Sequence, residues 1–185
     1  MMYLSKGLVA CGDNKDIFYV SHCGRVFAMG PEQAKLWQSA QHGPKEVPAG
    51  KERLIQSMAG SGIVSVTEET GKLAKYRLLT DCIICPEHEA AGWKVFGRDR
   101  RIWTWIQRAG LRLTASELIR LEEQGQRPEP SLLGENGRQQ LTEQIYSRET
   151  IFDGILESAM EQSAVRDACV ASLLRLLRAG KLYLV

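Results

Sequence analysis

One pattern occurs twice in this chain of 185 residues: an apolar segment of helical type stops at Ala-Gly, and a β-rich segment begins within a few residues. The first copy is residues 54–60 before residues 63–66, and the second is residues 173–180 before residues 182–185. Glycine permits the turn that ends a helix sharply, so that the strand can come back against it. The pattern predicts an α+β protein with two helix–glycine–strand units.

The first half of the chain predicts strands, then helices, then strands again. Aromatic and β-branched runs on either side of Gly24 predict a hairpin. A helix should start at Pro31, because proline has no amide hydrogen to leave unsatisfied in a first turn. The expected elements are strands at 7–10, 17–20, 25–29, 63–67 and 73–85, a loop at 42–50, a turn at 68–72, and helices from 31 and over 51–59.

The second half is mostly helical. We place a linker at residues 86–97, which gives one domain over residues 1–90 and another over residues 98–185. Thr114 and Glu117 match a capping box, in which the threonine oxygen accepts a backbone amide and the glutamate reaches back. The expected elements are helices at 100–109, 114–124, 136–146, 150–160 and 163–179 and a strand at 181–185.

The order helix, glycine, strand resembles the end of a winged-helix domain, where the last helix meets the wing. The likeness covers residues 27–85 and 150–185. Residues 63–85 resemble a complete wing, which is a two-stranded ribbon, whereas the second half has a single wing strand and more helices than the simplest winged helix needs. The resemblance implies tandem winged-helix-like domains, the second mostly helical.

A second resemblance concerns the N-terminal half alone. Short strands followed by Pro31-Glu32-Gln33-Ala34-x-x-Trp37 are similar to the PqqD-like peptide-recognition domains of modified-peptide biosynthesis. Those domains also place small strands before a trio of helices. The long ribbon expected after the last helix departs from that family. This resemblance implies a protein or peptide partner.

The charge is nearly balanced, but its residue types are not evenly spread. A net charge of +2 does not by itself indicate nucleic acid. In residues 93–185, however, 12 of the 14 basic residues are arginine, whose planar fork of donors suits phosphate or carboxylate. The second half is therefore the more favourable place for charged recognition, although arginine also lies on ordinary solvated helix faces.

Three groups of side chains are candidates for double-stranded DNA. One flanks the helix at 51–59, one lies at the expected wing turn, and one is a basic and aromatic stretch with the start of the final helix. The alternative is that these residues lie on solvated faces with the tryptophans in the core. The candidates are Lys51, Arg53, Gln56, Ser57, Lys72, Lys75, Arg98, Arg100, Arg101, Arg108, Arg112 and Arg166.

Cys82, Cys85 and His88 form a C-x-x-C-x-x-H pattern, and thiolates and imidazole are good zinc ligands. A fourth ligand would have to come from elsewhere, from Cys11, Cys23 or His22. The stiff Ile-Ile pair between Cys82 and Cys85 favours the other interpretation, in which both cysteines are small buried residues at a strand end. We expect no cofactor.

The sequence lacks the nucleophile elbow, the phosphate loop, the H-E-x-x-H motif and the dinucleotide fingerprint, so we do not expect an enzyme. It has no signal-peptide pattern and no apolar stretch of bilayer length. These features predict a cytoplasmic protein with reduced cysteines and no membrane partner.

Two functions follow from the sequence. The first is a DNA-binding transcriptional regulator that neutralises phosphates with arginine and lysine. The alternative is a protein or peptide adaptor on a winged-helix scaffold with no DNA binding, which the near-neutral charge favours. The alternative predicts an exposed apolar groove or edge strand beside the N-terminal hairpin. A homodimer is left open.

Overall fold

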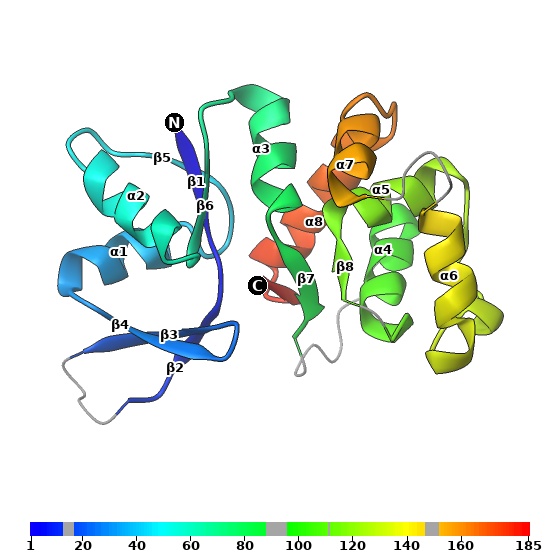
Figure 1. Ribbon diagram of the computed structural model, residues 1–185, viewed down its shortest axis with the longest axis horizontal. Coiled ribbons are helices and arrows are strands. Elements are labelled where there is room, and N and C mark those ends of the chain that lie inside the picture. Colours follow the sequence, from blue (N-terminus) through cyan, green and yellow to red (C-terminus); the bar gives the residue numbers. More distant parts are fainter. Residues whose placement is uncertain (13–16, 88–95, 111, 147–151) are drawn as a thin grey trace. The chain divides into compact units, whose positions relative to one another are not determined.

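A computed structural model describes residues 1–12, 17–87, 96–110, 112–146 and 152–185 (Figure 1). The chain divides into two compact units. Unit 1 is Met1–Cys82 with Tyr183–Val185, and unit 2 is Ile83–Leu182. Helices alternate with small antiparallel sheets, which confirms the α+β class.

The central sheet of unit 1 has its first strand in the middle. β1 (Met2–Ser5) lies between the short β5 (Lys45–Glu46) and β6 (Val64–Thr67), antiparallel to both. β1 was not predicted, because its sequence is too short and mixed to show an apolar alternation. The register of β1 against β6 is Met2↔Thr67, Tyr3↔Val66, Leu4↔Ser65 and Ser5↔Val64.

Helices α1 (Pro31–Ser39) and α2 (Glu52–Gly60) bury their apolar sides in the core of unit 1. α1 begins at Pro31, as predicted. α2 has the expected apolar face, but the residue with positive φ after it is Gly62 (φ +79°) rather than Gly60. The amide of Gly62 and the next amide donate to Ala59 O and Met58 O, which closes the helix end.

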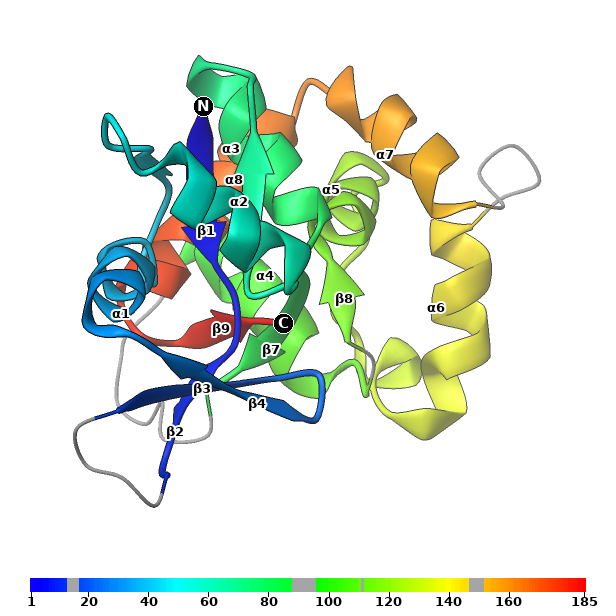
Figure 2. The ribbon, with the colours of Figure 1, turned by 60° about the vertical axis from the view of Figure 1, so that its left-hand side comes forward.

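The predicted hairpin is confirmed as part of a second sheet, which we call the hairpin sheet. It consists of β2 (Leu8–Ala10), β3 (Phe18–His22) and β4 (Arg25–Met29), in that spatial order (Figure 2). Cys23 and Gly24 form its two-residue turn with φ of +48° and +75°. Positive φ at both positions matches the twist of a tight hairpin.

The predicted wing of unit 1 is wrong. Residues expected as its second strand form helix α3 (Gly71–Thr80) instead. Leucine, alanine, lysine and arginine dominate this stretch, and all four favour helix. Ala74 and Leu78, one helical turn apart, are both fully buried. Only β7 (Ile83–Pro86) keeps the extended conformation, and it belongs to unit 2.

Unit 2 repeats the sheet order of unit 1. β7 lies between the short β8 (Leu113–Thr114) and β9 (Leu182–Leu184), which begins in unit 2. β7 and β8 are antiparallel, with Ile83 opposite Thr114. The helices are α4 (Gly97–Arg108), α5 (Ala115–Glu123), α6 (Arg138–Ile145), α7 (Asp153–Glu161) and α8 (Arg166–Arg178), with 3₁₀ turns at Pro130–Leu132 and Glu135–Gly137.

Two sequence signals place the ends of these helices correctly. Thr114 caps α5 and, with Glu117, forms the predicted capping box. α8 ends before Gly180, whose φ is +63°. The amides of Gly180 and Lys181 donate to the carbonyls of Leu177 and Leu176, the same pattern that closes α2 in unit 1.

Candidate functional site

The hairpin sheet has one face on the core of unit 1. Side chains alternate between the faces of a sheet. On the inner face, Val20 and Met29 are buried, and Phe18 and Phe27 pack partly against the same core. The Phe18 ring lies 5.8 Å from that of Trp37. This contact fixes the sheet on α1 and leaves its other face outside the core.

The opposite face, which we call the outer face, carries no charge. The register places its side chains in two rows, Leu8–Ser21–Val26 and Ala10–Tyr19–Ala28. Val26 is 61% exposed and Leu8 is 37% exposed. An uncharged face with exposed apolar side chains is a candidate interaction surface.

β4 is an edge strand of the hairpin sheet. His22 and Arg25 close the two-residue turn, and hydrogen bonding alternates along an antiparallel pair, so Val26 and Ala28 direct their backbone N–H and C=O away from β3. No backbone hydrogen bond from another described segment reaches the outer edge of β4. An unpaired edge beside an uncharged face is a template for another strand.

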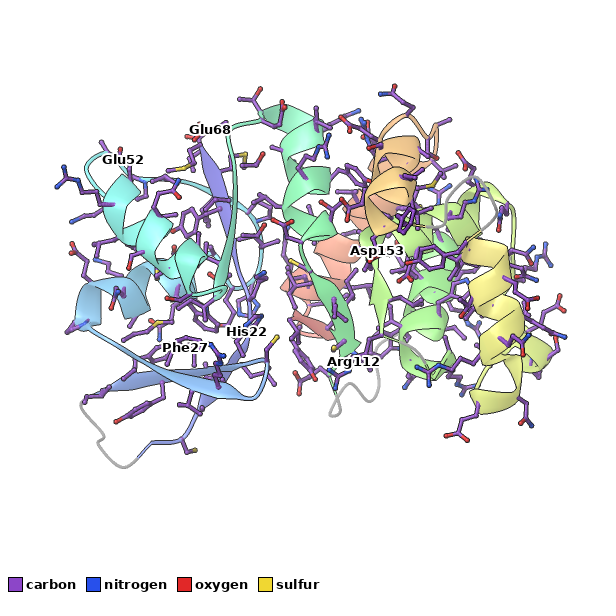
Figure 3. The ribbon with its side chains drawn as sticks, viewed as in Figure 1. His22, Phe27, Glu52, Glu68, Arg112 and Asp153 are labelled. Atoms are coloured by element: carbon purple, nitrogen blue, oxygen red, sulfur yellow. The ribbon has the colours of Figure 1, made fainter. Side chains whose placement is uncertain are left out.

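The described strands of the hairpin sheet hold one permanently charged side chain, the exposed Arg25 (Figure 3 labels the neighbouring His22 and Phe27). Partial burial, and then the positive charge of Lys6, lower the pKa of His22, so its imidazole is neutral at pH 7. The edge is therefore mildly basic at the turn and uncharged beyond it.

The DNA-contact residues predicted in unit 1 do not lie on a wing. Lys51 forms an ion pair with Glu32, and the Gln56 amide donates to Met1 Sδ at 3.3 Å. Arg53 and Ser57 are exposed on α2. The other two predicted residues, Lys72 and Lys75, lie on α3.

In unit 2, α4 and the end of α5 bring together two of the predicted arginines. Glu122 Oε1 accepts from Arg101 Nε at 2.9 Å, and Glu122 Oε2 accepts from Arg101 Nη2 at 2.8 Å and from Arg98 Nε at 3.2 Å. The Glu122 side chain is only 3% exposed, whereas those of Arg98 and Arg101 are 36% and 40% exposed. The two guanidinium groups thus enclose one buried carboxylate.

A hollow of about 240 Å³ opens beside this group. Arg101, Glu122, Gly125, Gln126 and Arg127 line it. Arg127 was not predicted, although Arg98, Arg101 and Arg127 are all arginines of the same half. It follows α5, after the turn at Gly125 (φ +67°), and its proximity to α4 depends on the tertiary fold. We call Arg98, Arg101, Glu122 and Arg127 the arginine cluster.

The remaining predicted arginines of unit 2 lie elsewhere. Arg100 and Arg108 are exposed on α4, and Arg112 is exposed before β8 (Figure 3). Arg166 forms an ion pair with Asp167 at 2.9 Å and donates to Glu161 O. Arg166 is therefore already occupied at the start of α8.

α8 and the tryptophan beside it are part of the core. Seven of the 13 residues of α8 are buried: Cys169, Val170, Ser172, Leu173, Leu174, Leu176 and Leu177. A helix buried over most of its circumference presents little surface to a groove. Trp105 is also fully buried, so the interpretation with tryptophan in the core holds there. Its Nε1 has no hydrogen-bond partner among the described residues.

The predicted metal ligands are not assembled in the described part of the chain. Cys82 and Cys85 are buried, Cys11 and Cys23 are exposed, and His88 lies outside the described residues. Burial raises the pKa of Cys82 to about 12, and its thiol donates to Leu78 O at 3.2 Å. Burial and this hydrogen bond favour the other interpretation, in which Cys82 is a small buried residue. Within the described ranges, no group of three or more His, Cys, Asp or Glu could hold a metal.

Comparison with protein-family models, curated proteins and solved structures gives no match for this chain. In the described ranges, no helix combines the length and the apolar character needed to cross a bilayer. The resemblances to winged-helix and PqqD-like domains therefore remain predictions.

Proposed function

We propose that this protein is an interaction adaptor that binds an extended segment of a partner protein along the edge of β4. The segment adds a strand to the hairpin sheet, antiparallel to β4. The observation that carries the proposal is the coincidence of an unpaired edge with the uncharged outer face. In this binding mode, backbone hydrogen bonds supply affinity and alternate side chains supply specificity.

The chemistry of the edge defines the partner. Side chains of the added strand that lie on the outer face would contact Val26 and Ala28, so these positions should be apolar. Arg25 is exposed at the turn and has no carboxylate opposite it among the described residues of the sheet. An acidic residue at the matching end of the segment complements it. The partner is thus an extended, apolar segment with one acidic end.

A DNA-binding transcriptional regulator is the second candidate. Arg100, Arg108 and Arg112 favour it, because all three are exposed in unit 2. Two observations weigh against it: Arg98, Arg101 and Arg166 already bind carboxylates, and α8 is largely buried. This function predicts binding to mixed DNA fragments that weakens steeply with salt. Undetectable binding at low salt excludes it.

Selection from a phage-displayed library of random peptides tests the adaptor function. Enriched peptides should alternate apolar residues and carry an acidic end, and their addition should shift the amide resonances of β4 in ¹⁵N spectra. Ala28→Pro removes an outward N–H that no other strand uses, and proline is tolerated at such an edge. It should weaken the peptides about tenfold, the value of roughly one lost hydrogen bond.

Ala28→Thr is the matched control, because it changes the same side chain and keeps the amide hydrogen. It should bind within about twofold of the original chain, since an edge threonine fits a strand. Arg25→Glu should reverse the preference for the acidic end. No enrichment, or equal affinity for the proline and threonine variants, overturns the proposal. Light scattering shows whether a second copy of the chain occupies the edge instead.

A further inference from the structure

The arginine cluster has more positive charge than its own carboxylate neutralises. Two guanidinium groups, those of Arg98 and Arg101, pair with one buried carboxylate, and a third, that of Arg127, lines the hollow beside Arg101, so the cluster has a net charge of +2. Arg98 uses only Nε towards Glu122, and Arg101 uses Nε and Nη2. Each guanidinium has five N–H donors, so several remain unused by the carboxylate.

The buried carboxylate also orients the arginines. A bidentate pair fixes the plane of the Arg101 guanidinium, which costs a flexible side chain much of its freedom before any ligand arrives. Arg127 is exposed and lines the same hollow, and among the described residues no side chain pairs with it. In the described part of the chain, the hollow therefore combines a prearranged guanidinium group, that of Arg101, with an unpaired one, that of Arg127.

The wall between them does not repel an anion. The end of a helix carries partial negative charge on its last carbonyls. At the end of α5, however, the amides of Gly125 and Gln126 donate to Glu122 O and Leu121 O, and Glu123 is paired with Arg120 at 3.4 Å. Glu122 also lines the hollow, but its charge is paired with Arg98 and Arg101, so the net charge of the arginine cluster stays positive.

We propose that the arginine cluster binds the phosphoryl group of a small ligand. Arg101 and Arg127 donate to its oxygens, Gln126 lines the same hollow, and Glu122 positions Arg98 and Arg101. Guanidinium forks match phosphate oxygens in geometry as well as charge. The hollow of about 240 Å³ is smaller than a typical drug-sized pocket. It has room for a phosphoryl or pyrophosphoryl group.

Titration with inorganic phosphate and with pyrophosphate tests this site, with sodium chloride of equal ionic strength as the reference. The amide resonances of Gly125 and Gln126 should shift saturably with either ion and not with chloride. Arg127→Ala should weaken pyrophosphate about tenfold, the value of one lost charge-assisted hydrogen bond. Arg127→Lys should weaken it less, because lysine keeps the charge but loses the fork.

Arg138→Ala is the matched control, because Arg138 is an exposed arginine of α6 in unit 2 and does not line the hollow. It should leave pyrophosphate binding unchanged. Equal shifts with chloride, or equal losses in the Arg138→Ala and Arg127→Ala variants, overturn the proposal. A DNA duplex titrated in parallel distinguishes the source of the phosphate. If Arg127→Ala weakens DNA binding and pyrophosphate shifts no amide resonance in any variant, the cluster binds nucleic-acid phosphates, and the small-ligand proposal is wrong.

Discussion

The two units share a frame and differ in what is added to it. In the sheets β5-β1-β6 and β8-β7-β9, the first strand in the sequence lies at the centre, between a short two-residue strand and a strand that follows a glycine-terminated helix; of β9, only Leu182 belongs to unit 2. Unit 1 inserts the hairpin sheet between its central strand and α1. Unit 2 inserts α6 and α7 between α5 and α8. The shared sheet order therefore occurs twice in the chain, and the segments inserted into it differ.

The two units also treat charge differently. Unit 1 leaves an uncharged sheet face open to solvent and makes its ion pair between exposed side chains, Lys51 and Glu32. Unit 2 buries a carboxylate, Glu122, between two arginines. Because a surface pair contributes little and a buried charge is costly to leave alone, the same substitution should have unequal effects in the two units.

The largest difference should come from Glu122→Gln and Glu32→Gln. Glu122→Gln removes the negative charge and replaces one of the two acceptor oxygens that Arg98 and Arg101 use with an amide NH2 group. Because both arginines are partly exposed and can be hydrated, the free energy of unfolding should fall by about 2–3 kcal/mol, below the range of about 3–5 kcal/mol for a fully buried pair. Glu32→Gln should cost below about 1 kcal/mol. Urea denaturation measures both, and equal losses would contradict the contrast.

The buried tryptophans give a second contrast. Trp37 and Trp105 are both fully buried, but Trp37 Nε1 donates to Lys6 O at 3.0 Å, whereas Trp105 Nε1 has no partner among the described residues. Trp37→Phe leaves the Lys6 carbonyl without this hydrogen-bond donor, whereas Trp105→Phe removes a donor that has no partner among the described residues. Trp37→Phe should therefore be more destabilising by about 1–2 kcal/mol. A larger loss for Trp105→Phe would mean that its indole N–H is satisfied after all.

Helix caps give a smaller contrast. Thr114 Oγ1 accepts from Glu117 N at 3.3 Å, and Thr114→Ala should cost about 1 kcal/mol. α1 of unit 1 has Gly30 at its cap, with ordinary dihedral angles and no neighbour nearer than 3.9 Å to an added Cβ. Gly30→Ser should therefore stabilise the chain by a few tenths of a kcal/mol. Thermal unfolding measures both changes, and destabilisation by Gly30→Ser would contradict the cap interpretation.

Local signals in the sequence predicted the local structure well. The hairpin, the proline that starts α1 and the capping box of α5 depend on neighbouring residues, and all three are confirmed. The prediction of a wing was wrong because the local sequence there was ambiguous. Residues 73–85 contain apolar positions compatible with either period, and the helix propensity of the stretch up to Thr80 prevailed over the expected ribbon. β5 and β8 have two residues each, and only their partners define them.

The candidate surfaces were less visible in the sequence. Both faces of β4 are apolar, so its alternation could not say that Val26 and Ala28 lie outside while Met29 is buried. Arg98 and Arg101 were selected from one basic stretch, but Glu122 and Arg127 join them only through the packing of α4 and α5. A buried carboxylate that organises distant arginines leaves no local pattern for the sequence to show.

The smallest contrast concerns pH and lies within unit 2. Two hydrogen bonds from Arg175, at 2.6 and 2.8 Å, hold the pKa of Asp99 below its usual value. A carboxyl whose pKa is lowered by folding stabilises the fold above its unfolded value, about 4, and loses this contribution as pH falls through the lowered pKa. The contribution of Glu117 to stability changes with pH in the opposite direction, because burial raises its pKa. Its contribution is complete below its unfolded value and is lost as pH rises through the raised pKa.

Asp99→Asn should therefore lower the free energy of unfolding at neutral pH and make it less dependent on pH on the acid side. Glu117→Gln should remove the loss of stability that accompanies deprotonation of Glu117 as pH rises. Glu117 also shares a hydroxyl with Asp153: Tyr146 Oη lies 2.8 Å from Glu117 Oε1 and 2.7 Å from Asp153 Oδ1. The Tyr146 hydroxyl has one proton, so it can donate to only one of these two oxygens at a time. When Glu117 is protonated, it can donate to Tyr146 Oη while the hydroxyl donates to Asp153, and both contacts are then hydrogen bonds. Urea denaturation at a series of pH values measures both slopes. Identical profiles for the two variants would mean that neither carboxyl sets the pH response of unit 2, and that its acid sensitivity arises elsewhere in the chain.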